Sequence, residues 1–294
     1  MLLGLIYSLI SAFAFGSMAI IIKIGYNAGM TGGEMMQYRF IYAVLVLFVV
    51  LLIKDRSLLK ISRLQLGKCA FIGLIIYWLQ TSCFVNALAT IPASTASLVL
   101  YVHPIAVTLI SALLLNMKID RFVTFSLALV MTGCCLVFYD AFLKEVDMTG
   151  LLYGIGAMVF YSFYLVLVQV LLKGLKPLTA TFYVMLFASI SFTISGDPSA
   201  WLHATWEHAA IGFSLGVLPG VIAVAFLYTA IEKIGSTYTC IFSSVEPVVT
   251  LVSAGIFLNE NIVMLQICGA SLIIAGIIVP NARALMLKNQ ISQP

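Results

Sequence analysis

The second half of this chain repeats the first. The stretches 91–119 and 234–262 align without gaps when positions 143 apart are compared. Their identities include a proline in the middle and a Leu–Asn pair near the end: Ile91 with Ile234, Val102 with Val245, Pro104 with Pro247, and Leu115–Asn116 with Leu258–Asn259. A repeat of this length means that two copies of one structural unit build the fold. The pattern therefore predicts two equivalent halves that pack against each other.

The repeated units are too apolar for a water-soluble fold. Of the 294 residues, 63% are hydrophobic and 9% are charged, whereas soluble domains carry about 25% charged residues. The charges fall in short loops between long apolar runs, as a lipid environment requires. The net charge of +4 forms no basic stripe, so no nucleic-acid partner is expected. We expect an all-α integral membrane protein whose surroundings are the lipid bilayer.

Turn residues and charges divide the chain into apolar runs of bilayer length. Each half then holds five spans, and because five is odd, the second half enters the membrane from the opposite side. The sequence therefore predicts two inverted five-helix repeats, residues 1–140 and 148–283, followed by a cytoplasmic tail, 284–294. The ten predicted spans are 4–25, 32–53, 66–89, 92–115, 120–139, 149–172, 178–195, 208–231, 235–258 and 262–281.

Lysine and arginine give the orientation of these spans. Cytoplasmic loops are enriched in these residues, and one set of loops, with the tail, holds twelve of the fifteen. The opposite set holds most of the acids. We therefore expect both termini to be cytoplasmic, in a cell (inner or plasma) membrane. The twelve are Lys54, Arg56, Lys60, Arg63, Lys68, Lys118, Arg121, Lys173, Lys176, Lys233, Arg283 and Lys288.

Two ionisable residues are predicted near the middle of the membrane. Glu246 follows Gly235 by eleven residues, which is roughly 16 Å into a ~30 Å core. His103 is its repeat partner, at the same depth from the other side. A charged acid there costs about 2.5–3.5 kcal/mol, so Glu246 must face water, be paired or be protonated. We expect both to contact a substrate or a coupling proton; purely structural roles are the alternative.

Other candidates depend on where side chains point. Arg39 lies inside the second span and either reaches the interface or lines the path of a solute. Aromatic residues that face the centre could stack on a substrate or hold an ammonium group; the candidates are Phe15, Tyr77, Trp78, Tyr101 and Tyr161. Prolines inside spans bend helices and expose carbonyl groups; these are Pro104, Pro219 and Pro247. No metal or cofactor is expected, although His203 and Glu207 stand one helical turn apart.

The order of short motifs adds a family resemblance. The second half runs through Ser244–Val249, Leu258–Glu260, Gln266–Ala270 and Leu272–Gly276, and the first half through Phe15–Ser17, Arg39–Phe40, Pro104 and Thr132–Gly133. Over essentially its whole length the chain resembles two copies of the EamA-type transporters of the drug/metabolite transporter superfamily. The resemblance implies alternating access and a central cavity lined by the first four spans of each half. Two residues depart from the family pattern. Met117 stands where the first repeat usually carries the acid that Glu260 supplies in the second. Phe15 stands where a tryptophan is common.

These observations favour a secondary transporter and not an enzyme. The expected cargo is a small zwitterionic, cationic or aromatic metabolite, such as an amino acid or amine, with export favoured over import. A proton or counter-flow of a second substrate is the candidate driving force. One alternative is a nucleotide-sugar or sugar-phosphate carrier, which would need several buried cations. The alternative from another class is a membrane-embedded enzyme, but the sequence has no H-E-x-x-H motif and no paired intramembrane aspartates.

Overall fold

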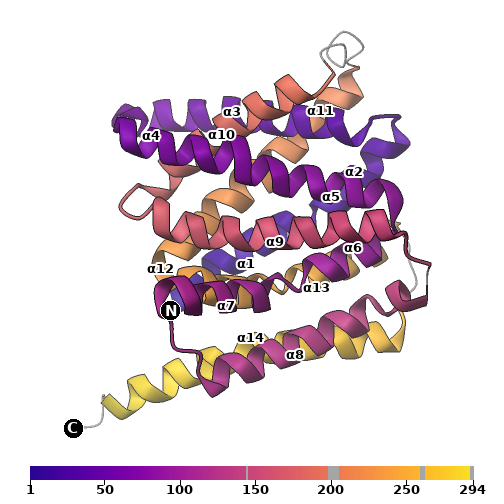
Figure 1. Cartoon of the computed structure of the whole chain (residues 1–294), viewed down its shortest axis with the longest axis vertical. Coiled ribbons are helices and arrows are strands. Elements are labelled where there is room, and N and C mark those ends of the chain that lie inside the picture. The colour runs from indigo at the N-terminus through magenta and orange to yellow at the C-terminus, as the bar shows by residue number, and fades with distance from the viewer. Residues whose placement is uncertain (144, 198–204, 259–261, 292–294) are drawn as a thin grey trace.

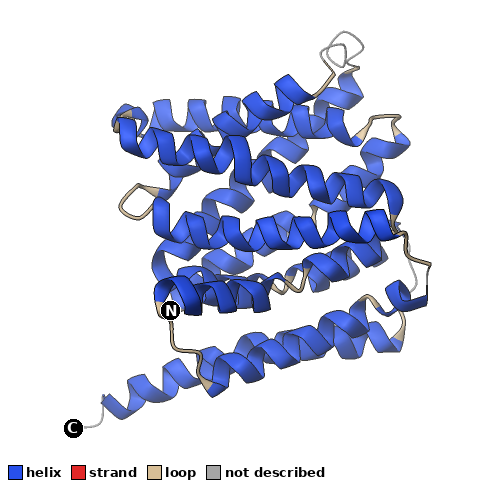
Figure 2. Cartoon of the chain, viewed as in Figure 1, coloured by secondary structure: helices blue, strands red, loops and turns tan. Residues whose placement is uncertain are grey.

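A computed structural model describes residues 1–143, 145–197, 205–258 and 262–291. Within these ranges the regular structure is helical, with no strand (Figure 2). The helices run side by side across the view, from α3 and α10 at one edge to α8 and α14 at the other (Figure 1). Trp201, His203 and Glu260 lie outside the described residues.

The first half forms eight α-helices. Their bounds are α1 Leu2–Gly16, α2 Met18–Asn27, α3 Gly32–Lys54, α4 Arg63–Ala70, α5 Trp78–Thr90, α6 Ala93–Leu100, α7 His103–Leu115 and α8 Arg121–Val137. A π-helical segment, η2 (Phe71–Tyr77), joins α4 to α5, and short 3-10 turns cover Arg56–Leu59 and Tyr139–Leu143.

The described residues of the second half form six α-helices. Their bounds are α9 Met148–Leu171, α10 Pro177–Ser195, α11 Trp206–Leu215, α12 Ala223–Ser243, α13 Glu246–Leu258 and α14 Met264–Ile291. A second π-helical segment, η5 (Gly216–Ile222), joins α11 to α12. Inside α12, Gly235 adopts φ +78° and ψ 165° and interrupts the helical backbone, a conformation that glycine tolerates without steric cost. Helix α14 continues without a break to Ile291, within the stretch predicted as a tail.

Local sequence explains where several helices start. At the N-terminus of α3, the Thr31 hydroxyl accepts from the Glu34 backbone N–H, and the Glu34 carboxylate accepts from the Thr31 N–H. The Asp120 carboxylate accepts from two N–H groups at the start of α8. Such caps satisfy backbone donors that have no partner within the helix. They fix the helix ends in the loops and leave the apolar runs between them uninterrupted.

The structure repeats two local irregularities at the repeat spacing. The fourth predicted span of each half breaks into two helices, at Tyr101–Val102 and at Ser244–Val245. Pro104 and Pro247 follow these breaks in the first turn of α7 and α13. Each proline stands where its missing N–H leaves no bond unmade, and the expectation that these prolines bend their spans stays a prediction. The π-helical segments η2 and η5 likewise occupy matching places in the two third spans, and Pro219 lies inside η5.

Helix contacts between the two halves recur in matching pairs. Helix α1 packs on α12 as α9 packs on α5, and α3 contacts η5 as α10 contacts η2. The second helices, α3 and α10, contact each other, and so do the fifth, α8 and α14 (Figure 1). Such matching pairs of contacts are expected of two copies related by a pseudo-two-fold axis. The same packing brings the breaks in the fourth span of each half into the interior.

Seven helical segments of the described chain are long and apolar enough to cross a membrane. The predicted count of ten is not confirmed by these criteria. The fifth and tenth predicted spans are shorter apolar helices, Arg121–Val137 and Met264–Val279, and the eighth and ninth lie in one helical run of 48 residues. The seven are Leu2–Asn27, Gly32–Lys54, Arg63–Thr90, Ser94–Leu115, Met148–Leu171, Pro177–Ser195 and Trp206–Ser253.

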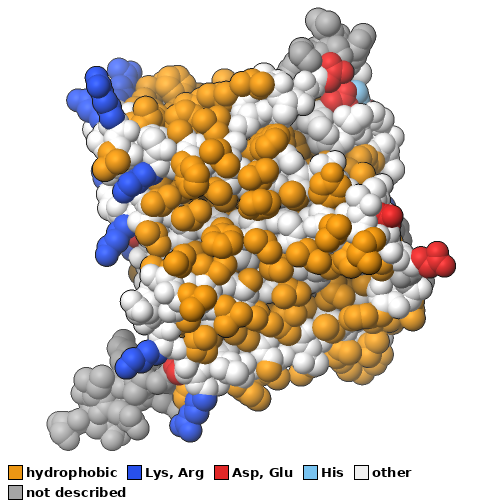
Figure 3. All heavy atoms as spheres, in the orientation of Figure 1, with side chains coloured by type: hydrophobic (Ala, Val, Ile, Leu, Met, Phe, Trp, Pro, Cys, Tyr) orange, Lys and Arg blue, Asp and Glu red, His pale blue; other side chains and the backbone are white. Residues whose placement is uncertain are grey.

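Most charged side chains on the molecular surface lie at the ends of the helices. On the face shown in Figure 3, lysine and arginine side chains gather at one side of the molecule, acids gather mainly at the other, and a broad hydrophobic band lies between them. The first turn of α1 and the end of α14 both lie on the side of the basic residues (Figure 1). Exposed apolar surface between charged rims is what lipid requires, so the chain is a multi-pass membrane protein.

Candidate functional site

Arg39 lies in the interior and does not reach the surface. Only 3% of it is exposed. One guanidinium nitrogen, Nη2, donates to the Tyr77 hydroxyl at 3.3 Å and to the Pro219 carbonyl at 3.1 Å. Arg39 and Tyr77 belong to the first half, and the Pro219 carbonyl comes from the π-helical segment of the second half. Because the Arg39 side chain is buried, it points into the interior and does not reach the membrane interface.

Stacked tyrosines extend from Arg39 across the interior. The Tyr77 and Tyr164 rings stack with centroids 4.9 Å apart, and the Tyr161 and Tyr164 rings stack at 6.0 Å. The Tyr164 hydroxyl donates to the Tyr228 hydroxyl at 2.9 Å. Buried tyrosines normally find such partners for their hydroxyl groups. Three packed helical elements, η2, α9 and α12, hold this stack in place.

His103 continues the chain of contacts at the start of α7. Its ring lies edge-on to Tyr161 at a centroid distance of 4.8 Å. Its Nδ1 lies 3.0 Å from the Leu100 carbonyl. Because a carbonyl only accepts, this contact assigns the proton to Nδ1 and leaves Nε2 as an acceptor when the ring is neutral. His103 is buried, so the protein interior encloses its ring.

Glu246, from the second half, is the last residue in this series of interacting side chains. It stands in the first turn of α13, where its carboxyl interacts electrostatically with the Tyr101 hydroxyl. Tyr101 in turn lies 6.2 Å from His103, centroid to centroid. Unlike Arg39, Glu246 keeps part of its surface accessible. The interior polar cluster is thus built from both repeats: Arg39, Tyr77, Tyr101, His103, Tyr161, Tyr164, Tyr228 and Glu246.

Arg39 and Glu246 carry the formal charges of this cluster. They attract each other electrostatically, but no ion pair joins them directly, and aromatic rings lie between. An unpaired cation and an unpaired carboxyl that share an interior are costly in low dielectric. The arrangement can receive a molecule that brings a charge of its own to either end.

The structure places the remaining predicted residues outside these contacts. The Trp78 indole donates to the Ser195 hydroxyl of α10 at 3.1 Å. Phe15 packs against the main apolar core. Tyr164 and Tyr228, which the prediction did not select, belong to the cluster. The available signal was that Tyr164 follows Tyr161 by three positions and so shares its helix face.

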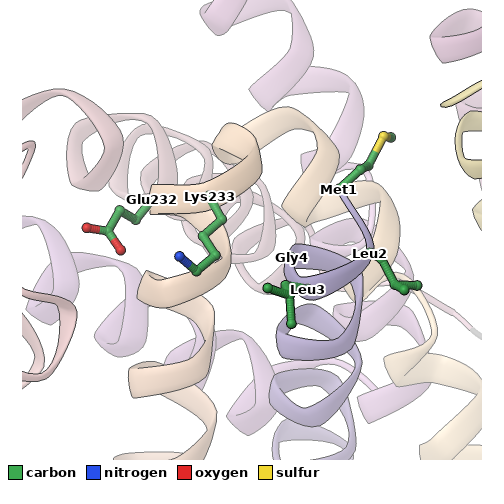
Figure 4. A pocket seen from close by; sticks show the side chains of 6 residues that line it. All are labelled: Met1, Leu2, Leu3, Gly4, Glu232 and Lys233. Atoms are coloured by element: carbon green, nitrogen blue, oxygen red, sulfur yellow. The ribbon is translucent and has the colours of Figure 1, made fainter. Parts of the chain in front are cut away.

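Two cavities lie away from the cluster, towards the helix ends. The larger, ≈ 580 Å³, is open and lies between the first residues of α1 and the Glu232–Lys233 pair (Figure 4). The second, ≈ 260 Å³, lies where α7, α9 and α12 approach one another. Its lining residues are Ser111, Leu115, Met117, Gln169, Ile234, Gly235, Ser236, Thr237 and Tyr238.

Neither a metal-binding group nor a strand-to-helix nucleophile turn is found among the described residues. They contain no group of three or more histidine, cysteine or acidic side chains that could hold a metal ion. Residues Gly212–Gly216 have the spacing G-x-S-x-G, which can mark a hydrolase nucleophile on a strand-to-helix turn. Here Ser214 lies within α11, and its hydroxyl donates to the Ala210 carbonyl at 2.9 Å. That spacing therefore carries no catalytic chemistry.

Comparison with known proteins agrees with this architecture. A model of the EamA-like transporter family matches residues 2–139 and again 148–281. Protein WALLS ARE THIN 1 of Arabidopsis thaliana is 32% identical over 135 residues, which is 44% of this chain and 34% of that protein, so the match spans about a third of the plant protein.

Two further similarities cover the whole chain. An uncharacterized transporter of Archaeoglobus fulgidus is 22% identical over 275 residues, 92% of this chain and 93% of its own length. A crystal structure with 17% identity superposes with a TM-score of 0.79 over 99% of both chains; at this identity it supports the fold alone. Because the family model matches both halves at the repeat boundaries, this chain belongs to the EamA-like transporter family.

Proposed function

We propose that the chain is a secondary transporter that moves a small zwitterionic, cationic or aromatic metabolite by alternating access, in the direction of export. The observation that carries the proposal is the interior polar cluster. It places a buried guanidinium and a carboxyl of opposite charge at the two ends of a stack of tyrosine rings. The family membership supports transport as the general activity.

The cluster favours a cargo with both charged and apolar parts. Arg39 keeps one buried donor, Nε, without a partner, and leaving such a donor unpaired costs about 1–3 kcal/mol. A carboxylate of the cargo would use it. An ammonium group would approach Glu246, and tyrosine faces attract cations and apolar rings. An amino acid or an aromatic amine fits this arrangement better than a phosphorylated sugar, because Arg39 is the one buried lysine or arginine among the described side chains.

The transport cycle that we infer uses ten membrane crossings in two inverted halves. The 48-residue helical run would form two of them, with the non-helical backbone at Gly235 as the return point, and α8 and α14 would form the peripheral two. Basic loops would face the cytoplasm of a cell membrane, with both termini on that side. The cluster would then lie near the midplane, where inverted-repeat transporters bind their cargo.

A thermal-shift screen followed by counter-flow tests the proposal. A ligand at about 100 times its Kd should stabilise the purified protein by about 2.7 kcal/mol. We expect hits among amino acids, amines and aromatic metabolites, and accelerated uptake of the labelled hit into proteoliposomes loaded with the same compound. Hits confined to sugar phosphates or nucleotide sugars would support the alternative carrier class.

Glu246→Gln tests the role of the carboxyl. The amide keeps the shape of the side chain but neither carries charge nor exchanges a proton in the working pH range. Affinity for a cationic or zwitterionic ligand should fall by about tenfold or more, as expected from the loss of a charged hydrogen bond, and the pH dependence of binding should disappear. Glu232→Gln, an exposed acid on α12, is the control. Wild-type affinity and pH profile in Glu246→Gln would show that the residue is structural.

A further inference from the structure

The ≈ 260 Å³ cavity has a polar interior built by both halves of the chain. The backbone N–H of Ser236 donates to the Gln169 side-chain oxygen at 2.6 Å, and the Ser111 and Ser236 hydroxyls lie 3.2 Å apart. The Thr237 hydroxyl, which also belongs to a lining residue, is buried without a hydrogen-bond partner. Buried hydroxyl groups without partners are uncommon in proteins. None of the lining residues carries a formal charge.

The cavity lies on the same helix faces as the interior polar cluster. On α7, Ser111 follows His103 by two helical turns, and on α9, Gln169 follows Tyr161 by the same interval, so each pair is separated by about 12 Å along one face. The His103 and Tyr161 rings are in contact at the level of the cluster. Two turns further along, at the level of the cavity, Ser111 and Gln169 both contact Ser236. The two sites therefore follow one another along the α7–α9 interface.

An apolar layer separates the two levels. Val107 lies between His103 and Ser111 on α7, and Leu165 lies between Tyr161 and Gln169 on α9. Both are fully buried and belong to the main apolar core. Below them, the Gln169–Ser236 hydrogen bond ties α9 to the segment after Gly235. The route from the cavity to the cluster is closed in this structure by packing and by this bond.

The repeat does not account for the Ser111 and Ser236 hydroxyl groups. At the repeat spacing of 143 positions, Ser111 corresponds to Ala254 and Ser236 corresponds to Ala93, whereas Thr237 corresponds to Ser94. The sequence of the other repeat therefore keeps a hydroxyl at the Thr237 position but lacks the Ser111–Ser236 pair. An asymmetric polar cavity on one side of a duplicated fold indicates a role that belongs to that side alone.

We propose that this cavity, the polar antechamber, is a second binding site, which takes neutral hydrogen-bonding groups of the transported molecule at the basic side before the molecule reaches the cluster. Opening of the Gln169–Ser236 bond would admit the molecule past Val107 and Leu165. This inference rests on the proposed transport function, but its test does not require the cargo to be known.

Cysteine reactivity measures access to the antechamber directly. The six native cysteines are first replaced, and single cysteines are introduced at Leu115 on the rim and at Ser111 on the floor. Leu113, two residues from each on the same helix and 80% exposed on the apolar surface, is the matched control. Proteoliposomes are treated from one side or the other with membrane-impermeant methanethiosulfonates, one anionic and one cationic, and rates are normalised to each reagent's reaction with a free thiol.

From the side of the basic loops, we expect Leu115→Cys and Ser111→Cys to react at least about tenfold faster than Leu113→Cys. The anionic and the cationic reagent should react at similar normalised rates, because the lining of the cavity is uncharged. Adding Gln169→Ala should accelerate the Ser111→Cys reaction by about tenfold, which corresponds to a shift of about 1.4 kcal/mol towards the open state. Gln169→Met, which keeps the length of the side chain without its acceptor, repeats the test if Gln169→Ala fails to fold.

Three results would overturn the proposal. They are a Ser111→Cys rate no higher than that of Leu113→Cys, a strong preference for one reagent charge, or no acceleration in either Gln169 variant. Glu246→Gln in the same background should leave the labelling rates unchanged while it weakens ligand binding. Loss of the Glu246 effect with intact labelling would therefore reject the proposed function of the cluster and not the accessibility of the antechamber.

Discussion

Arg39 illustrates how a single residue constrains the chemistry of the interior. Its guanidinium is buried and donates to a phenol and to a backbone carbonyl, both neutral acceptors. Neutral partners lower the cost of burying a charge but do not cancel the charge. Glu246 balances it only across the width of the tyrosine stack. An arginine held in this way is suited to a ligand that completes its hydrogen bonding.

Arg39→Lys keeps the charge and tests the need for the guanidinium. An ammonium is a point charge and does not reproduce the planar, forked donor geometry of arginine. We expect affinity for a ligand identified in the screen to fall by about tenfold to a hundredfold, which corresponds to about 1.5–3 kcal/mol for a charged hydrogen bond. Isothermal titration of purified protein measures this.

Arg56→Lys, at an exposed loop position, serves as the control for the loss of any arginine and should bind as the wild type does. Equal affinity of Arg39→Lys and wild type for every ligand would place Arg39 outside the binding site.

At the scale of elements, the pairing of α8 with α14 shows how small residues set helix separation. A Cβ atom added at Gly269 would lie 2.6 Å from the Gly133 carbonyl oxygen, and one added at Gly133 would lie 2.6 Å from the Gly269 carbonyl oxygen. The two backbones are therefore in direct contact at this crossing, as small residues permit in membrane helices. Because the glycines come from equivalent fifth helices, one crossing joins the peripheries of both halves.

Gly269→Ala should loosen this crossing. The added methyl group has no space unless the helices separate, and overpacking of this kind costs about 1–3 kcal/mol. We expect a lower Tm in detergent, with the cluster and its ligand affinity preserved, because the crossing is remote from it. The control is Gly67→Ala in α4, where an added Cβ meets nothing within 4 Å and helix propensity favours alanine by about 1 kcal/mol. An unchanged Tm for Gly269→Ala would mean that the crossing is not tightly packed in the membrane.

At the scale of the whole molecule, the distribution of charge predicts the orientation of the chain. On the face shown in Figure 3, the basic side chains collect at one end of the bundle and most of the acids at the other. Cytoplasmic loops of membrane proteins are enriched in lysine and arginine, so we expect the basic end to face the cytoplasm. The antechamber lies at the basic end, and the proposed order of binding follows from that placement.

Topology can be measured with cysteines at exposed loop positions. Lys60→Cys, at the basic end, should be labelled by an impermeant thiol reagent only after the cells are opened, and Glu145→Cys, at the acidic end, should be labelled in intact cells. Both positions are exposed in the structure, so absence of labelling reports membrane sidedness and not burial. The reverse pattern would invert the orientation and place the antechamber on the outside.

The sequence alone determined the features that depend on the solvent. Apolar runs of bilayer length, loops that hold the charges, and a duplication at a fixed spacing follow from the need to satisfy every backbone group in lipid. The fold class and the family came from these features, as did His103 and Glu246, because ionisable residues in apolar runs are rare. Arg39 could be identified as a candidate, but the direction of its side chain could not.

Only the tertiary structure decided which side chains meet. The prolines marked an irregularity in each fourth span, and the structure located the break just before each of them. Tyr164 and Tyr228 joined the cluster, and Trp78 turned towards Ser195, because the rotation of each helix about its axis depends on packing against partners from the other half. Periodicity defines a helix face, but long-range contacts between the two repeats decide what that face touches.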